Sequence, residues 1–195
     1  GGPIVRASTS DPNQDRRQRA YQTSPSRAGI VFLAQHEGQM RNLIFEQVTV
    51  RDCTQNGVAI CGAENIIIAS CDFSDNGSSV SPGPGLQHDL LLAHVPNASV
   101  RDSRFDDSLW GSGVDLSGSH EVNMLNNEAA RNALNGIHVT ESSNIRLHGN
   151  LTEGNDQNGI LVDAQMAGCQ KIEVIDNVSR NNGGNGILTD RAGST

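Results

Sequence analysis

Two residues with acid–base side chains, Asp115 and His138, occupy equivalent places in two similar segments, G-V-D-L and G-I-H-V. In an alternating strand pattern both side chains point outward, from neighbouring strands about 4.8 Å apart. A carboxylate beside an imidazole favours the charged ring and fixes its tautomer, as proton transfer requires. We therefore interpret His138 as a candidate acid/base, Asp115 as its orienting partner, and Asp163, placed diagonally to His138, as a second carboxylate. The alternative is a tolerated polar pair on a solvated sheet face.

Five further residues border the same predicted face and are candidates for binding a substrate. His88 and Asp89 replace an Asn-Gly dipeptide found in other segments, which the turn propensity of Asp explains as well as function does. His94 lies at the end of that segment. Trp110 is a candidate stacking platform for a sugar ring, and Arg131 a candidate contact for a uronate carboxylate.

Asp163 and Asp190 are predicted to stack in one outward column, on adjacent strands. Like charges at this spacing repel unless they are neutralised or well solvated. The pair is therefore a candidate calcium site, and simple solvation is the alternative. No cofactor is required by the predicted chemistry.

These residues lie on a repeat of about 23 residues. Glycine-led segments such as N-G-V-A-I and N-G-I-H-V alternate with a second apolar segment, whose copies begin 23, 32, 24, 23 and 27 residues apart. Apolar and polar residues alternate over only four or five positions, which is the period of a half-buried strand. Three short strands per unit cannot bury their inner faces alone, so successive units must stack in parallel. The two longest spacings contain insertions at 77–87 and 164–170, which we expect to flank one face.

Polar residues at the predicted turns recur in two columns. Asparagine tolerates the left-handed backbone conformation, and its amide both donates and accepts hydrogen bonds, so stacked copies can bridge neighbouring coils. We predict two internal ladders. The first contains Val48, Cys71, Ser103, Asn127, Asn150 and Asn177, and the second contains Cys53, Asn76, Ser108, Asn132, Asn155 and Asn182.

This pattern resembles the right-handed parallel β-helix repeats of carbohydrate-active proteins, including pectate lyases, mannuronan C5-epimerases, alginate lyases and phage tailspikes. The resemblance covers Gly29 to about Arg191. It implies an all-β, right-handed, single-stranded parallel β-helix of roughly six to seven coils. It also implies action on an extended polysaccharide by lyase, epimerase or hydrolase chemistry. The Asp-Pro-His signature of mannuronan epimerases is absent from this sequence, so no named activity is carried over.

Two other functions fit the same repeat. A β-helix can serve as a non-catalytic glycan-binding module, or as a structural solenoid such as a fibre segment or a fragment of a larger protein. The sequence ends at Thr195, directly after a predicted strand and without a capping segment. We therefore expect self-association or continuation of the solenoid at that end.

Composition narrows the class of partner and the compartment. The net charge is −8, and residues 1–27 carry five Arg against two Asp, so the remainder carries −11. This acidity argues against a nucleic-acid partner. The sequence contains no run of about 18 apolar residues, so no membrane span is predicted. We predict an irregular arm over residues 1–28, a β-helix domain over residues 29–195, and an extracellular or periplasmic location. The four cysteines are either free thiols or form a Cys53–Cys71 or Cys61–Cys169 disulfide.

Overall fold

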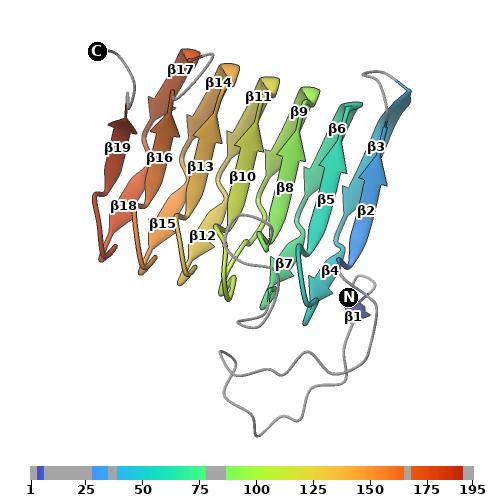
Figure 1. The fold of residues 1–195 in the computed structure, drawn as a ribbon, viewed down its shortest axis with the longest axis horizontal. Helices are drawn as coiled ribbons and strands as arrows, with labels where there is room; N and C mark the ends of the chain where they lie inside the picture. Colours follow the sequence, from blue (N-terminus) through green and yellow to red (C-terminus); the bar gives the residue numbers. More distant parts are fainter. Residues whose placement is uncertain (1–3, 7–27, 35–38, 78–86, 165–167, 191–195) are drawn as a thin grey trace, which may run out of the picture.

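The computed structural model describes residues 4–6, 28–34, 39–77, 87–164 and 168–190, which form nineteen strands stacked into a parallel β-solenoid (Figure 1). About six turns of about 24 residues each build the stack. The predicted fold class is confirmed. The part of the chain that the structure describes contains no helix that could cross a membrane.

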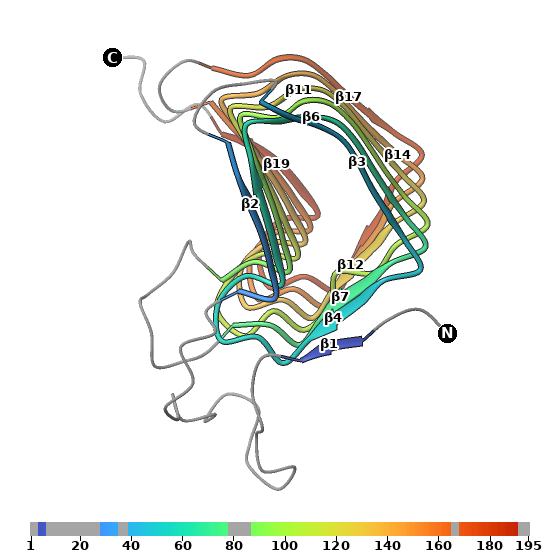
Figure 2. The ribbon, with the colours of Figure 1, turned by 90° about the vertical axis from the view of Figure 1, so that its right-hand side faces the viewer.

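Three faces run the length of the solenoid, as the view along its axis shows (Figure 2). The glycine-led strands form a seven-stranded sheet of β2 (Ile30–Leu33), β5 (Val58–Cys61), β8 (Leu90–Ala93), β10 (Val114–Ser117), β13 (Ile137–Thr140), β16 (Ile160–Asp163) and β19 (Ile187–Asp190). The second face is a six-stranded sheet of β3 (Met40–Glu46), β6 (Ala63–Ala69), β9 (Pro96–Arg101), β11 (His120–Leu125), β14 (Ser143–His148) and β17 (Gln170–Ile175).

The third face consists of two short sheets. The first contains β1 (Ile4–Arg6), β4 (Thr49–Arg51) and β7 (Asp72–Ser74), and the second contains β12 (Glu128–Ala130), β15 (Leu151–Glu153) and β18 (Val178–Arg180). Arg104 joins them through bridges to Asp72 and Glu128. Strand β1 lies in the segment for which the sequence predicted only an irregular arm, and it pairs in parallel with β4. Residues 7–27, most of the first insertion (78–86) and part of the second (165–167) lie outside the described residues.

The core is a set of apolar columns that follow the strand register. Val114 pairs with Ile137 and Leu116 with Val139, and all four side chains are fully buried. Because side chains alternate across a strand, Asp115 and His138 must then lie on the outer surface. The register that the sequence predicted for the candidate site is therefore confirmed.

The predicted asparagine ladders are present at the corners. In the first column Asn150 accepts from the backbone N–H of Asn127 at 3.0 Å, and Asn177 accepts from that of Asn150 at 2.8 Å. In the second, Asn132, Asn155 and Asn182 are linked in the same way. A third ladder, not predicted from the sequence, uses the residue before the glycine that leads each strand, or before Asp89 in one coil: Asn56, His88, Ser112, Asn135, Asn158 and Asn185.

The four cysteines carry free thiols, so neither disulfide forms. At the last coil, Val178 and Ile187 are about half exposed, and β19 pairs only with β16 among the described strands. Pairing of this edge with another copy or a further coil stays a prediction.

Candidate functional site

Asp115 and His138 are register neighbours on β10 and β13, on the outer face of the seven-stranded sheet. His138 Nδ1 lies 2.8 Å from Asp115 Oδ2. Both side chains are largely covered, with exposed fractions of 21% for His138 and 12% for Asp115. The sequence-based pairing of these two residues is therefore reproduced as a direct contact.

The second ring nitrogen of His138, Nε2, is buried and has no hydrogen-bond partner within the residues that the structure describes. Burial by itself lowers the pKa of His138, but the hydrogen bond to Asp115 and the charges of Asp115 and Asp163 outweigh it, and the pKa is raised. Burial likewise raises the pKa of Asp115, and the contact with His138 and the nearby ring of His88 reverse this, so its pKa is lowered. The pair is therefore held as carboxylate and imidazolium over a wider pH range than isolated side chains would be.

His88 lies on the other side of Asp115 and is almost completely buried. Its Nε2 is 3.7 Å from Asp115 Oδ2, the same oxygen that contacts His138. The ring is also part of the third ladder, because its Nδ1 accepts a hydrogen bond from the N–H of Ser112 at 3.0 Å. The sequence pointed to His88 as a surface contact for substrate, whereas the structure places it beneath the site.

Asp89 is fully buried and faces away from this group, toward the second ladder. At the equivalent Gly57 a Cβ atom would meet the amide of Asn76 at 2.5 Å, so side chains at this position are directed at the ladder. Asp89 Oδ1 accepts from Asn76 Nδ2 at 2.8 Å. It thereby fills the ladder position that the sequence assigned to Ser108. The buried Oδ2 of Asp89 has no partner.

We predict that Asp89→Asn stabilises the protein at neutral pH. Burial raises the pKa of Asp89 well above its ordinary value, and the charges of Asp106 and Asp107 add to this, against hydrogen bonds from Asn76. A carboxyl group with a raised folded-state pKa favours folding below its unfolded-state pKa and loses that contribution as pH rises through the folded-state pKa. Asparagine keeps the accepting oxygen and removes the charge. Chemical denaturation at pH 8 should show a gain of about 1 to 3 kcal/mol.

The gain should shrink as the pH falls toward 4, where Asp89 itself is protonated. Asp102→Asn is a suitable control, because Asp102 is exposed and the same substitution there should change stability by less than about 0.5 kcal/mol. A variant at position 89 that is less stable than the parent at pH 8 would contradict this interpretation.

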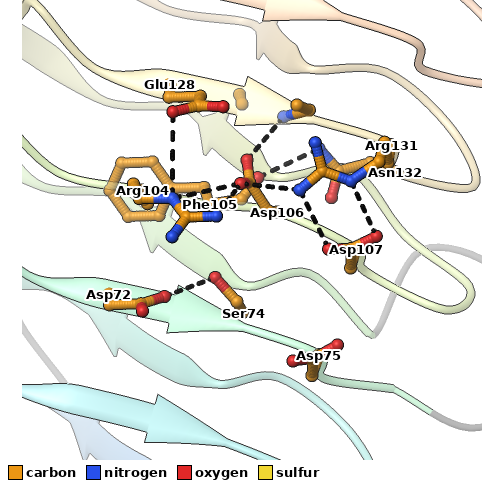
Figure 3. Close-up of polar contacts among 12 residues, drawn as sticks. Asp72, Ser74, Asp75, Arg104, Phe105, Asp106, Asp107, Glu128, Arg131 and Asn132 are labelled. Atoms are coloured by element: carbon orange, nitrogen blue, oxygen red, sulfur yellow. Dashed lines mark hydrogen bonds and ion pairs between the residues drawn. The ribbon is translucent and has the colours of Figure 1, made fainter.

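Arg131, in the corner between β12 and β13, forms ion pairs with a separate acidic cluster (Figure 3). Its guanidinium bonds to the fully buried Asp106 at 3.0 Å and to Asp107 at 3.1 Å. Arg104 bonds to Asp106 from the other side at 2.6 Å. This network was not predicted from the sequence. Arg131 reaches Asp106 and Asp107 in the preceding coil. A uronate contact by Arg131 stays a prediction, although its guanidinium already has two carboxylate partners.

Two further candidates lie at opposite ends of the strands. Trp110 is 40% exposed in the turn before β10. His94 is exposed after β8, with its ring close to Gly118 after β10. Neither contacts Asp115 or His138 in the described part of the chain, and their roles in substrate binding stay predictions.

The sequence profile described as the right handed beta helix region matches residues 23–195. The chain belongs to this β-helix family. No curated protein sequence matches it. The family assignment agrees with the stacked coils and fixes the fold, while the family description itself carries no activity.

Solved structures of epimerases share this β-helix fold. A variant of the periplasmic alginate epimerase AlgG superposes with a TM-score of 0.67 and 24% identity, over 80% of this chain and 35% of that one. The A-module of the Azotobacter vinelandii mannuronan C-5 epimerase AlgE4 gives a TM-score of 0.65 and 15% identity, over 85% of this chain and 52% of that one. The chain therefore spans about a third of the first structure and about half of the second.

The β-helix register also places Asp163 beside Asp190, as predicted. Asp163 is buried, and Asp190 is exposed at the edge strand. No group of three or more His, Cys, Asp and Glu side chains is arranged to hold a metal ion within the described residues. A calcium ion at this pair would need most of its six to eight oxygen ligands from solvent or substrate.

Proposed function

We propose that this β-helix is an enzyme acting on an extended polysaccharide that lies across the strands of the seven-stranded sheet, with His138 as its acid/base. One observation carries the proposal. His138 is held at Nδ1 by Asp115 at 2.8 Å, and its other nitrogen is covered and has no hydrogen-bond partner among the described residues. Unsatisfied buried polar groups cost free energy and are uncommon in native structures. The side chain is 21% exposed, so a substrate group that displaces the atoms covering Nε2 would satisfy this nitrogen and exchange a proton with it.

The geometry supports distinct roles for the three residues. Asp115 fixes the tautomer of His138 and stabilises the imidazolium, which leaves Nε2 as the nitrogen that gives or takes the proton. Asp163, one coil further on, adds negative charge that favours the same imidazolium. The raised pKa of His138 extends the pH range over which the ring is the imidazolium, the form that can donate a proton.

The choice of first substrates follows from the similar solved structures, which are an alginate epimerase and a mannuronan C-5 epimerase. Alginate and mannuronan are therefore tested first, followed by other uronic and neutral polysaccharides. New unsaturated ends would identify a lyase, new reducing ends a hydrolase, and exchange of carbon-bound hydrogen with deuterated water an epimerase. Binding without any of these changes would favour a glycan-binding module instead, and no binding a structural solenoid. AlgG is a periplasmic enzyme, and this similarity supports an extracellular or periplasmic location for the present chain.

We further predict that calcium binds at Asp163 and Asp190 and assists an anionic substrate. The two carboxylates are register neighbours on an acidic sheet face, where a polyanion would otherwise be repelled. Isothermal titration calorimetry with calcium chloride should show binding at millimolar concentration, and Asp190→Asn should abolish it. Absence of heat, together with an unchanged melting temperature in calcium, would remove this site from the proposal.

A further inference from the structure

We propose that His88 is a positioning residue, which holds the carboxylate of Asp115 in place for His138, so that the three side chains form a His–Asp–His chain across three coils. The proposal rests on the function proposed for His138. It adds a residue that lies beneath the site and is too deeply buried to contact an extended polysaccharide.

Two hydrogen bonds place His88 in the third ladder. The backbone N–H of His88 donates to Asn56 Oδ1 at 2.8 Å, and the ring Nδ1 accepts from the backbone N–H of Ser112 at 3.0 Å. A ring nitrogen that accepts a hydrogen bond carries no proton, so the proton of the neutral ring lies on Nε2. The ladder therefore decides which nitrogen of His88 is a donor.

That donor faces Asp115. His88 Nε2 lies 3.7 Å from Asp115 Oδ2, and His138 Nδ1 lies 2.8 Å from the same oxygen. The longer distance exceeds that of a hydrogen bond, so the attraction is electrostatic, in a covered place where such attraction is strong. This attraction favours the ionised form of Asp115 and its position beside His138.

The third ladder does not itself require a histidine. Asparagine fills the same column at Asn56, Asn135, Asn158 and Asn185, and serine fills it at Ser112. Asn56, Ser112, Asn135 and Asn158 each accept from the backbone N–H of the next coil, and Asn185 donates at the end of the ladder. A histidine adds a second polar atom on the far side of the ring, and the coil that carries it is adjacent to the one that carries Asp115. The one histidine of this ladder, His88, therefore lies in the coil next to the candidate site.

Four charged or titratable groups of the described residues lie near His88. Asp115 on β10, His138 on β13 and Asp163 on β16 face the outer surface, and Asp89 lies next to His88 but bonds to Asn76. Replacement of His88 should therefore change the position and pKa of Asp115 first, and through Asp115 the pKa of His138.

The test uses two substitutions with opposite effects. His88→Asn restores the usual ladder residue and removes the donor that faces Asp115, whereas His88→Gln keeps a donor near the position of Nε2 and loses the ladder acceptor. We expect His88→Asn to fold normally. It should lower the pKa of His138 by about half a unit, because the carboxylate of Asp115 loses its attraction to His88 and is held less firmly beside His138. His88→Gln should melt at a lower temperature, with a His138 pKa closer to that of the parent.

The pKa of His138 is measured by NMR titration of ring-labelled histidine, with its signal assigned by comparison with His138→Gln. His148, which lies 3.3 Å from Asp176 on the six-stranded sheet, is the internal control and should titrate unchanged. Should His88→Asn fail to fold, His88→Ser, the residue found at position 112, replaces it. An unchanged or raised pKa of His138 in the folded variant would overturn the proposal.

This measurement needs no substrate, so it can succeed or fail independently of the proposed enzymatic function. Once a substrate is known, His88→Asn should lower kcat and leave KM nearly unchanged, because His88 does not touch the polysaccharide. A purely structural role for His88 would predict the reverse order of the two variants, with His88→Gln more damaging to the His138 titration than His88→Asn.

Discussion

Turnover of the polysaccharide is expected to be abolished by His138→Ala, while the fold stays intact. The substitution removes a ring nitrogen, Nε2, that is buried and has no hydrogen-bond partner in the described part of the chain. It removes no core volume, because the buried Ile137 and Val139 on either side point into the solenoid and His138 points out. The melting temperature should therefore fall by no more than a few degrees. Product formation and thermal melting, measured on the same preparation, check both parts.

Three variants serve as controls for this result. His138→Asn keeps a hydrogen-bond donor near the position of Nδ1 for Asp115 and cannot transfer a proton, so it should be as inactive as the alanine variant. His148→Ala removes the histidine of the other outward His–Asp pair, on the six-stranded sheet, and should keep full activity. Asp115→Asn should reduce activity less than His138→Ala, since an amide can still orient the ring but cannot stabilise its charge. Full activity of His138→Ala would place the catalytic centre elsewhere.

The fold and the central pair could be predicted because both depend on strand register. The positions of Val114 and Ile137 in the core fix which residues point outward one step later in the sequence. Any slip of one residue would have placed Asp115 inside the core, which its charge does not allow. Spacing alone therefore brought Asp115 next to His138. The asparagine ladders were predictable for the same reason, because they recur at fixed places in each coil.

Features that depend on side-chain reach could not be predicted in this way. Repeat alignment placed His88 and Asp89 opposite Asn-Gly, but it did not say that His88 would take the ladder bond of asparagine or that Asp89 would bond to Asn76. Both follow from atomic distances inside the coil. The contacts of Arg131 with Asp106 and Asp107 bridge two coils at a corner, where long side chains have several directions open to them.

The pairing of β1 with β4 could not be predicted from the sequence for a different reason. Three residues, Ile4–Arg6, carry too short a pattern to show a period, and their partner strand β4 lies more than forty residues along the chain. Short strands of this kind are stabilised by the sheet that they join and not by their own sequence. The six-stranded sheet, whose strands are longer, gave the clearer signal.

Asn150 has the most completely bonded side chain of the first ladder. Its Nδ2 donates to Asn177 Oδ1 at 2.9 Å and to the carbonyl oxygen of Met124 at 3.1 Å. Its oxygen accepts from both the backbone N–H and the Nδ2 of Asn127, each at 3.0 Å. Four hydrogen bonds that link three coils therefore meet at one buried amide.

Replacing this amide by alanine should destabilise the protein by about 3 kcal/mol, because the buried N–H of Asn127 loses its acceptor and cannot reach water. Asn150→Ser should cost less, since Ser103 fills the same column and its hydroxyl accepts from the N–H of Cys71 at 3.0 Å. Asn123→Ala is the matched control: Asn123 is exposed on β11, and its loss should change stability by less than about 0.5 kcal/mol. Chemical denaturation of the three variants beside the parent gives the comparison. If Asn150→Ala costs no more than Asn123→Ala, the ladder amides exchange their bonds for water freely, and the stacking of the coils depends on the apolar columns alone.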